Sequence, residues 1–307
     1  MSSYDTLIKK IEKKMPELHC FTKKLTNNMS TNLTSFNNKL NDTLCEMNKS
    51  AQFRLNNFGA FYQLLKIVEN VDSEPVFIFD NDRFSILGVD SMQSSLSYVK
   101  IPIKIFLNYS VFVDDKVSSK FDLRRFLKFA NNLLEFNKIQ FDSSIDVSVD
   151  QNNRTISFEI TNNANEIITY KTYVLHDNKT TMSLPLLTNF DYSVTCNATS
   201  LFNFCKVLEG CNEYYVNITC NPNRFTIETE TMLNTFQTND SFNINTLGNF
   251  DETITQHFVL KDFISNLTNF SDNNKSCELY IKNNYPIFLK YHNELGSLFI
   301  GIQNKQY

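Results

Sequence analysis

The sequence predicts an α+β protein of two similar domains, because one pattern of helix, strand, turn and strand occurs twice. Residues 65–69 and 81–86 of the first half match residues 205–209 and 222–227 of the second, about 140 positions later. Residues 121–126 and 152–158 match residues 258–263 and 283–289 in the same order. Matched segments in one order indicate an internal duplication, and their apolar spacing fits both helices and strands.

The composition supports two folded domains. A chain of 307 residues is long enough for two cores of ordinary size. The hydrophobic fraction of 42%, with 28 Phe and 13 Tyr, argues against disorder over most of the length. The net charge of −4 argues against wholesale wrapping by nucleic acid, but it permits a locally basic surface on an acidic body.

Residues 1–52 lie outside the repeat. Lysines come in pairs at positions 9–10, 13–14 and 23–24, and residues 27–48 are mostly Asn, Ser and Thr. We interpret this Lys- and Asn-rich segment as a disordered or loosely helical extension. The alternative is a basic arm that contacts nucleic acid or a partner protein.

The first domain is predicted to span residues 53–173. Apolar residues from Phe58 to Val68 recur at helical spacing, and this helix must end before Pro75. Strands are expected at residues 76–79, 84–88, 94–106, 145–149 and 155–160.

A second helix is predicted at residues 120–136. Its apolar residues, including Leu123, Phe126 and Ala130, fall on one arc of the helix. Its basic residues fall on a separate arc, so the helix is expected to bury one face and expose a basic one.

A connector is predicted at residues 174–189, and a second domain at residues 190–307 repeats the plan of the first. We expect a strand near Tyr192, helices at residues 198–210 and 260–270, and strands between residues 213 and 231. Closing strands are expected at residues 277–282, 287–291 and 298–302.

The motifs of common enzyme classes are missing from the sequence. It has no glycine-rich phosphate loop, no G-x-S-x-G, no H-E-x-x-H and no C-x-x-C, and its four histidines are far apart. Its seven cysteines are scattered, which favours free thiols in a reducing compartment. No apolar run is long enough to span a membrane. We therefore predict a non-enzymatic intracellular protein without metal, cofactor or membrane partner.

Taken in order, these elements resemble the DNA sliding clamp family of proliferating cell nuclear antigen. The resemblance covers residues 55–305 and is carried by residues 84–96, by the helix and strand of residues 198–220, and by residues 258–298. It implies the DNA-clamp fold: two domains, each with two helices packed on antiparallel sheets, joined by an interdomain connector.

The resemblance also implies a homotrimeric ring around double-stranded DNA, with basic helix faces meeting phosphates without sequence preference. The implied DNA-binding residues are Lys66, Lys120, Arg124, Arg125, Lys128, Lys206 and Lys261. The implied subunit interface, taken as edge strands, contains Ile156, Phe158, Ile160, Tyr214, Val216 and Ile218.

By the same resemblance, DNA polymerase and other clamp-binding proteins would dock in a peptide groove. Its implied lining is Val89, Leu96, Leu184, Pro185, Leu186, Pro286 and Ile302. The chain departs from the family pattern here, because residues 300–302 are Ile-Gly-Ile where aromatic residues are expected, and Asn and Thr replace an acidic connector tip.

Three functional interpretations remain open at this point. The first is a processivity factor for DNA replication and repair, viral or from a divergent eukaryote, acting in the nucleus or a viral replication compartment. The second is a clamp-like subunit that does not close alone, such as part of a heteromeric clamp, a monomeric polymerase accessory or a viral transcription factor. The third is a scaffolding module that does not bind DNA.

Overall fold

The structure is a computed structural model that describes residues 49–112, 116–175, 189–210, 212–229, 233–237, 242–247, 252–267 and 276–304. The chain divides into two compact units, Met1–Lys49 and Ser50–Tyr307, and the account below concerns the second. Most of the predicted N-terminal extension and of the predicted connector lies outside the described residues.

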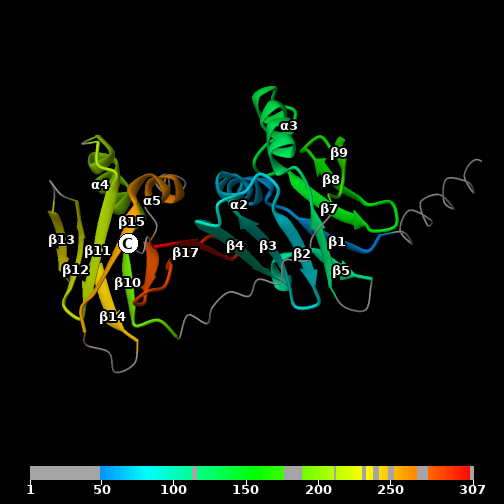
Figure 1. Cartoon of the computed structure of the whole chain (residues 1–307). Helices are drawn as coiled ribbons and strands as arrows, with labels where there is room; N and C mark the ends of the chain where they lie inside the picture. The colour runs from blue at the N-terminus through cyan, green and yellow to red at the C-terminus, as the bar shows by residue number, and fades with distance from the viewer. Residues whose placement is uncertain are drawn as a thin grey trace, which may run out of the picture. The chain divides into compact units, whose positions relative to one another are not determined.

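The two halves have the same order of elements: one strand, a helix, five strands, a second helix and three strands (Figure 1). The first half contains β1 (Ala51–Leu55), α2 (Phe58–Val71), β2 (Val76–Asp80), β3 (Arg83–Val89), β4 (Ser95–Pro102), β5 (Asn108–Val111), β6 (Val117–Lys120), α3 (Leu123–Glu135), β7 (Ser144–Asp150), β8 (Thr155–Thr161) and β9 (Ile167–Tyr173). The second half contains β10 (Tyr192–Asn197), α4 (Ala198–Gly210), β11 (Tyr215–Asn221), β12 (Arg224–Glu228), β13 (Leu233–Gln237), β14 (Phe242–Thr246), β15 (Ile254–Val259), α5 (Leu260–Leu267), β16 (Ser276–Ile281), β17 (Ile287–His292) and β18 (Ser297–Ile302). A short 3-10 helix, Ile103–Ile105, adds a turn between β4 and β5.

The sheet topology repeats as closely as the element order. The order β5-β1-β7-β8-β9 in the first half corresponds to β14-β10-β16-β17-β18 in the second. The order β4-β3-β2-β6 likewise corresponds to β13-β12-β11-β15. The halves differ in one respect: β18 pairs with β4, from Ser297 opposite Lys100 to Ile302 opposite Ser95, and this junction fuses two sheets into one of nine strands.

Four helices form a layer on one side of the sheets, and we call α2, α3, α4 and α5 the helix layer (Figure 1). Within it, α2 contacts α3 and α5, and α5 contacts α4. The Asn57 side chain caps α2 by accepting a hydrogen bond from the Ala60 N–H, and Asp122 caps α3 in the same way. The predicted start of the second helix at Lys120 is therefore wrong, because the cap places its first turn at Leu123.

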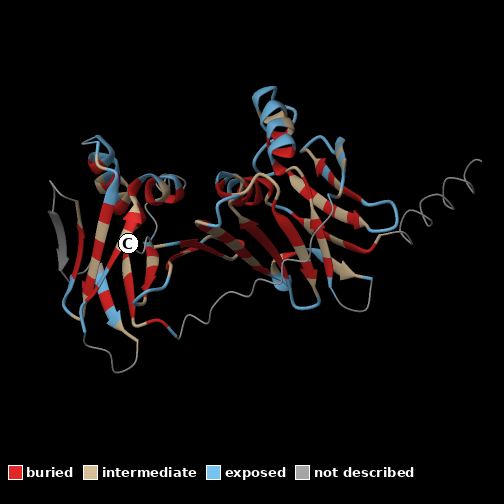
Figure 2. Cartoon of the chain, viewed as in Figure 1, coloured by how far each residue is buried: buried red, intermediate tan, exposed pale blue. Residues whose placement is uncertain are grey.

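The buried residues lie between the helix layer and the sheets, and between facing sheets (Figure 2). In the first half, Phe53, Phe77 and Phe84 are almost fully buried, and their rings contact one another or other phenylalanines. Burial of each such ring contributes about 1.5–3 kcal/mol. Most phenylalanines among the described residues are thus part of the core.

The four cysteines of the described residues are buried and unbridged. Burial raises the pKa of Cys205 and of Cys220 to about 12, so both thiols remain protonated at neutral pH. These side chains act as small apolar core residues. Among the described helices, none combines the length and the hydropathy needed to cross a membrane.

Candidate nucleic-acid interface and peptide groove

The helix layer carries most of the predicted DNA-binding residues. Lys66 of α2 and Lys206 of α4 occupy matching positions in the two halves, and both are exposed. Lys261 is exposed at the start of α5. Lys120 lies at the end of β6 instead of on a helix, and its ammonium is 3.4 Å from the Glu74 carboxylate.

Ion pairs compensate several of these cations. The Arg124 guanidinium lies 2.8 Å from Glu69, and the Lys206 ammonium lies 2.7 Å from Glu209. Arg125 pairs with its own helix cap, Asp122, at 2.9 Å. By contrast, Lys66, Lys128 and Lys261 have no acidic partner within 4 Å among the described side chains.

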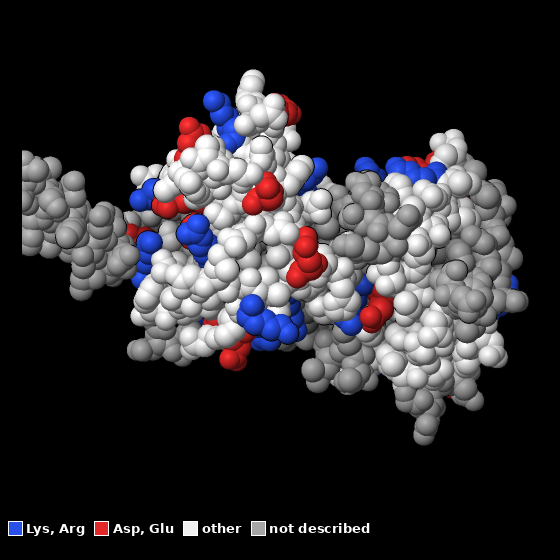
Figure 3. Space-filling view, turned by 180° about the vertical axis from the view of Figure 1, so that it is seen from behind, with Lys and Arg blue, Asp and Glu red and all other residues white. Residues whose placement is uncertain are grey.

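The consequence is a weakly positive helix layer. On the back of the molecule, opposite to the side seen in Figure 1, basic and acidic side chains are interspersed (Figure 3). Exposed ion pairs are worth little, so Arg124 and Arg125 can exchange their partners for a phosphate at small cost. The three lysines without acidic partners supply the least compensated positive charge.

The predicted interface residues do not lie at sheet edges, and this prediction is wrong. Ile156, Phe158 and Ile160 are fully buried on β8, which lies between β7 and β9. Val216 and Ile218 are fully buried on β11, which lies between β12 and β15, while Tyr214 precedes that strand and is exposed. The pleat turns these apolar side chains into the core, whereas β9 and β13 each lie at one end of their sheet.

The predicted groove residues are divided between two faces of the nine-stranded sheet. Val89 and Leu96 are cross-strand neighbours on the face away from the helix layer, which we call the outer face. Ile302 belongs to the core beneath the helices, so its assignment to the groove is wrong. Pro286 is half-buried in the turn before β17, and Leu184, Pro185 and Leu186 lie outside the described residues.

An apolar cluster covers the outer face beside Leu96. It consists of Phe190, Tyr280 and Phe288, with Leu96 and Leu247 packed against it. Phe288 lies over Gly301, where an added Cβ would come within 3.0 Å of the ring. The neighbouring strand therefore supplies an aromatic ring at the place where the last strand has glycine.

Sequence reasoning missed this cluster because it considered the last strand alone. Gly301 and Phe288 are direct cross-strand partners, which only the register reveals. Aromatic residues commonly cover a glycine on an adjacent strand.

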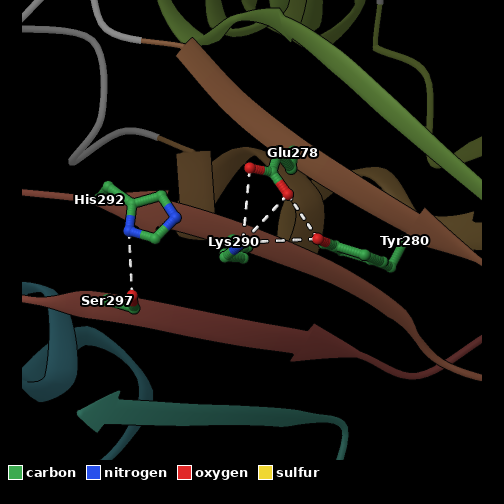
Figure 4. Close-up of polar contacts among 5 residues, drawn as sticks. All are labelled: Glu278, Tyr280, Lys290, His292 and Ser297. Carbon is green, nitrogen blue, oxygen red and sulfur yellow. Dashed lines mark hydrogen bonds and ion pairs between the residues drawn. The ribbon is translucent and has the colours of Figure 1, made fainter. Parts of the chain in front are cut away.

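A polar network lies next to the cluster on the same face (Figure 4). The Lys290 ammonium is 3.1 Å from the Glu278 carboxylate, and the Tyr280 hydroxyl donates a hydrogen bond to the same carboxylate. Burial by itself would raise the pKa of Glu278, but the hydrogen bonds from Tyr280 and Lys290 outweigh it, and the pKa is lowered. Burial, reinforced by the Glu278 carboxylate, raises the pKa of Tyr280.

A serine–histidine contact on this face does not form a catalytic triad. The His292 Nδ1 lies 2.9 Å from the Ser297 hydroxyl, and the two residues are cross-strand partners in the β17–β18 hairpin (Figure 4). A catalytic base is normally oriented by a third group, yet the Glu278 carboxylate is engaged by Lys290 and Tyr280. Across the ranges that the structure describes, His, Cys, Asp and Glu form no cluster of three that could hold a metal ion.

The lowered pKa of Glu278 predicts how stability depends on pH. A carboxylate with a lowered folded-state pKa contributes stability above its unfolded pKa, and this contribution is lost as the pH falls through the folded value. We expect Lys290→Gln to lower Tm at pH 7, with a gap from the wild type that closes as the pH falls below about 4. Thermal unfolding at a series of pH values measures this, with the exposed Lys104→Gln as control. A gap of equal size at every pH would rule out the Glu278 carboxylate as its source.

Solved structures of similar fold exist, although no protein-family model and no curated protein sequence matches the chain. A crystal structure of proliferating cell nuclear antigen from Entamoeba histolytica matches with a TM-score of 0.69 at 12% identity, covering 84% of this chain and 100% of that one. The protein of the same name from Thermococcus kodakaraensis matches with a TM-score of 0.68 at 15% identity, covering 83% and 100%. The chain therefore has the sliding-clamp fold, and the predicted fold class is confirmed.

Proposed function

We propose that the protein is a DNA sliding clamp. Copies of the chain join edge to edge into a ring, duplex DNA passes through it, and DNA polymerase and other replication or repair proteins are tethered to its outer surface. The observation that carries this proposal is the junction between β18 and β4. The strands that correspond to these two by duplication are β9 and β13, and each of them lies at the end of its sheet.

The duplication supplies the register of the proposed contact. In sheet order, β9 holds the place of β18 and β13 holds the place of β4. Pairing β9 with β13 of the next copy repeats the internal junction. When the register of β18 and β4 is applied to β9 and β13, Ile167 lies opposite Thr235 and Ile168 lies opposite Asn234.

The exposure of β9 supports this pairing. Its residues alternate between exposed and half-buried, with Ile167 at 64% and Tyr173 at 76%, whereas five of the six β18 residues are buried. An unpaired strand edge is a template for another strand, and a closed ring removes it. Three copies would form the ring that the sequence resemblance implies.

The helix layer is suited to DNA that slides through the ring without sequence-specific contacts to its bases. Lysine ammonium groups on helix faces meet phosphates as point charges and give affinity without base preference. The ion pairs at Glu69 and Glu209 keep this affinity low, so encirclement must provide persistence. Nothing in such a role requires chemistry on the bound DNA.

The oligomeric state tests the proposal. Sedimentation at micromolar concentration is expected to give the mass of three chains without any partner. A single-chain mass would contradict a self-closing ring and would favour a subunit of a heteromeric clamp or a monomeric accessory factor.

A further inference from the structure

A cavity of about 190 Å³ lies in the first half, beside the turn between β7 and β8. It is lined by Ser118, Ser119, Val149, Gln151, Arg154, Val174 and Leu175. Leu175 is the last residue described before the connector, so the cavity lies at the root of that segment.

The cavity contains a buried hydroxyl group that no described residue pairs with. Ser119 is fully buried on β6, and its Oγ has no hydrogen-bond partner within the part of the chain that the structure describes. A buried hydroxyl left unpaired costs roughly 1–3 kcal/mol, so such a group calls for an explanation.

The second half shows what occupies the equivalent place there. Ser119 lies opposite Phe77 on β2, and Gln256 lies opposite Ile218 on β11, the strand that corresponds to β2. The glutamine side chain is buried, and its Nε2 donates to the carbonyl oxygens of Lys282, at 2.9 Å, and Tyr285, at 2.7 Å. Gln256 thereby ties β15 to the turn between β16 and β17.

The two turns are built alike, which makes the comparison specific. The Tyr285 N–H donates to the Lys282 carbonyl at 3.2 Å, and the Arg154 N–H donates to the Gln151 carbonyl at 3.3 Å. Gln151 and Arg154, the counterparts of the two residues that Gln256 binds, both line the cavity. The Ser119 side chain is too short to reach the turn. The first half therefore has a cavity at the place that the Gln256 carboxamide fills in the second half.

We propose that this cavity is a binding site for a primary amide. The NH₂ group of the ligand donates to the carbonyl oxygens of Gln151 and Arg154, each of which has a second lone pair, and the Ser119 hydroxyl donates to the oxygen of the ligand. A carboxylate is disfavoured because it has no donor for the two carbonyls, and an ammonium ion is disfavoured because it has no acceptor for the Ser119 hydroxyl. The amide comes either from a glutamine or asparagine side chain of a bound protein or from a free small molecule.

Ligand titration tests the site in the whole chain. Propionamide is added to isotope-labelled protein, and propionate is added in parallel as the isosteric control without an NH₂ group. Propionamide is expected to shift the backbone resonances of Ser119, Gln151 and Val174 with a Kd on the order of millimolar, as befits a small fragment. The absence of these shifts, or an equal response to propionate, would overturn the proposal.

A second titration with short peptides identifies the source of the amide. The peptide acetyl-Ala-Gln-Ala is compared with acetyl-Ala-Glu-Ala, both with free carboxyl termini. Tighter binding of the glutamine peptide than of propionamide supports a protein side chain as ligand, whereas shifts with propionamide alone support a free amide. Failure of both to bind contradicts the site itself.

A pair of variants provides an independent readout. Ser119→Gln is expected to place its amide on the turn, as Gln256 does, and to raise Tm above that of Ser119→Met, which has similar volume but no donor. It is also expected to abolish the propionamide shifts. If the methionine variant is as stable as the glutamine variant, the cavity is merely apolar space and the amide assignment fails.

Discussion

Chains with aspartate at both Ile167 and Thr235 are expected to sediment as monomers. The proposed register places these two positions opposite each other at every junction, so the double variant sets two carboxylates side by side in a strand pair. Like charges brought together at an interface cost several kcal/mol, and every 1.4 kcal/mol is a factor of ten in affinity. We therefore expect the association to weaken by about 100-fold or more at each junction. Sedimentation equilibrium measures the change.

A charge swap distinguishes loss of register from loss of folding. The variant with Ile167→Lys and Thr235→Asp places opposite charges across the same junction and is expected to restore the assembly. Asp at position 167 alone is not expected to unfold the chain, because the Ile167 side chain is 64% exposed. A charge-swapped variant that stays monomeric would reject the register, even if the ring itself is correct.

Reversing Lys66, Lys128 and Lys261 to glutamate is expected to weaken the salt-dependent binding of DNA strongly while leaving the fold and the assembly intact. All three side chains are exposed on the helix layer, and no acidic partner compensates them among the described residues. Each phosphate contact contributes about 0.9 to the slope of log affinity against log salt. The three substitutions should therefore reduce that slope by roughly 2–3 per chain, and polymerase stimulation on long templates should disappear.

A matched triple variant controls for net charge. Arg83 begins β3, Lys104 lies in the short 3-10 helix and Lys116 precedes β6, so all three are exposed residues that do not belong to the helix layer. Reversing them to glutamate changes the charge by the same amount and is expected to retain most DNA binding. Equal losses in the two triple variants would show that overall charge, and not the helix layer, determines binding.

Much of the fold was predictable because its signals are local. The apolar spacing of residues 58–68 and the alternation in β8 mark a helix and a strand without knowledge of their neighbours. The duplication then supported these assignments, because a helix or strand predicted in one half was expected at the matching position of the other half.

The candidate site was harder to predict because it depends on pairings between distant strands. Ile156 and Phe158 indicate a strand, but no local signal shows that β8 is internal and that β9, with its Ile, Thr and Tyr residues, is terminal. The same limit hid the stacking of Phe288 on Gly301 and the correspondence of Ser119 with Gln256, since both emerge from register.

Covalent closure of the ring on DNA tests the central claim most directly. A chain with Ile167→Cys and Thr235→Cys is assembled in the presence of circular plasmid, oxidised to link the neighbouring strands, and treated with detergent. The account predicts a protein that stays with the circular plasmid under denaturing conditions and is released when the plasmid is cut once. Protein that leaves the intact circle, or that remains on the linear molecule, would contradict a ring closed through β9 and β13.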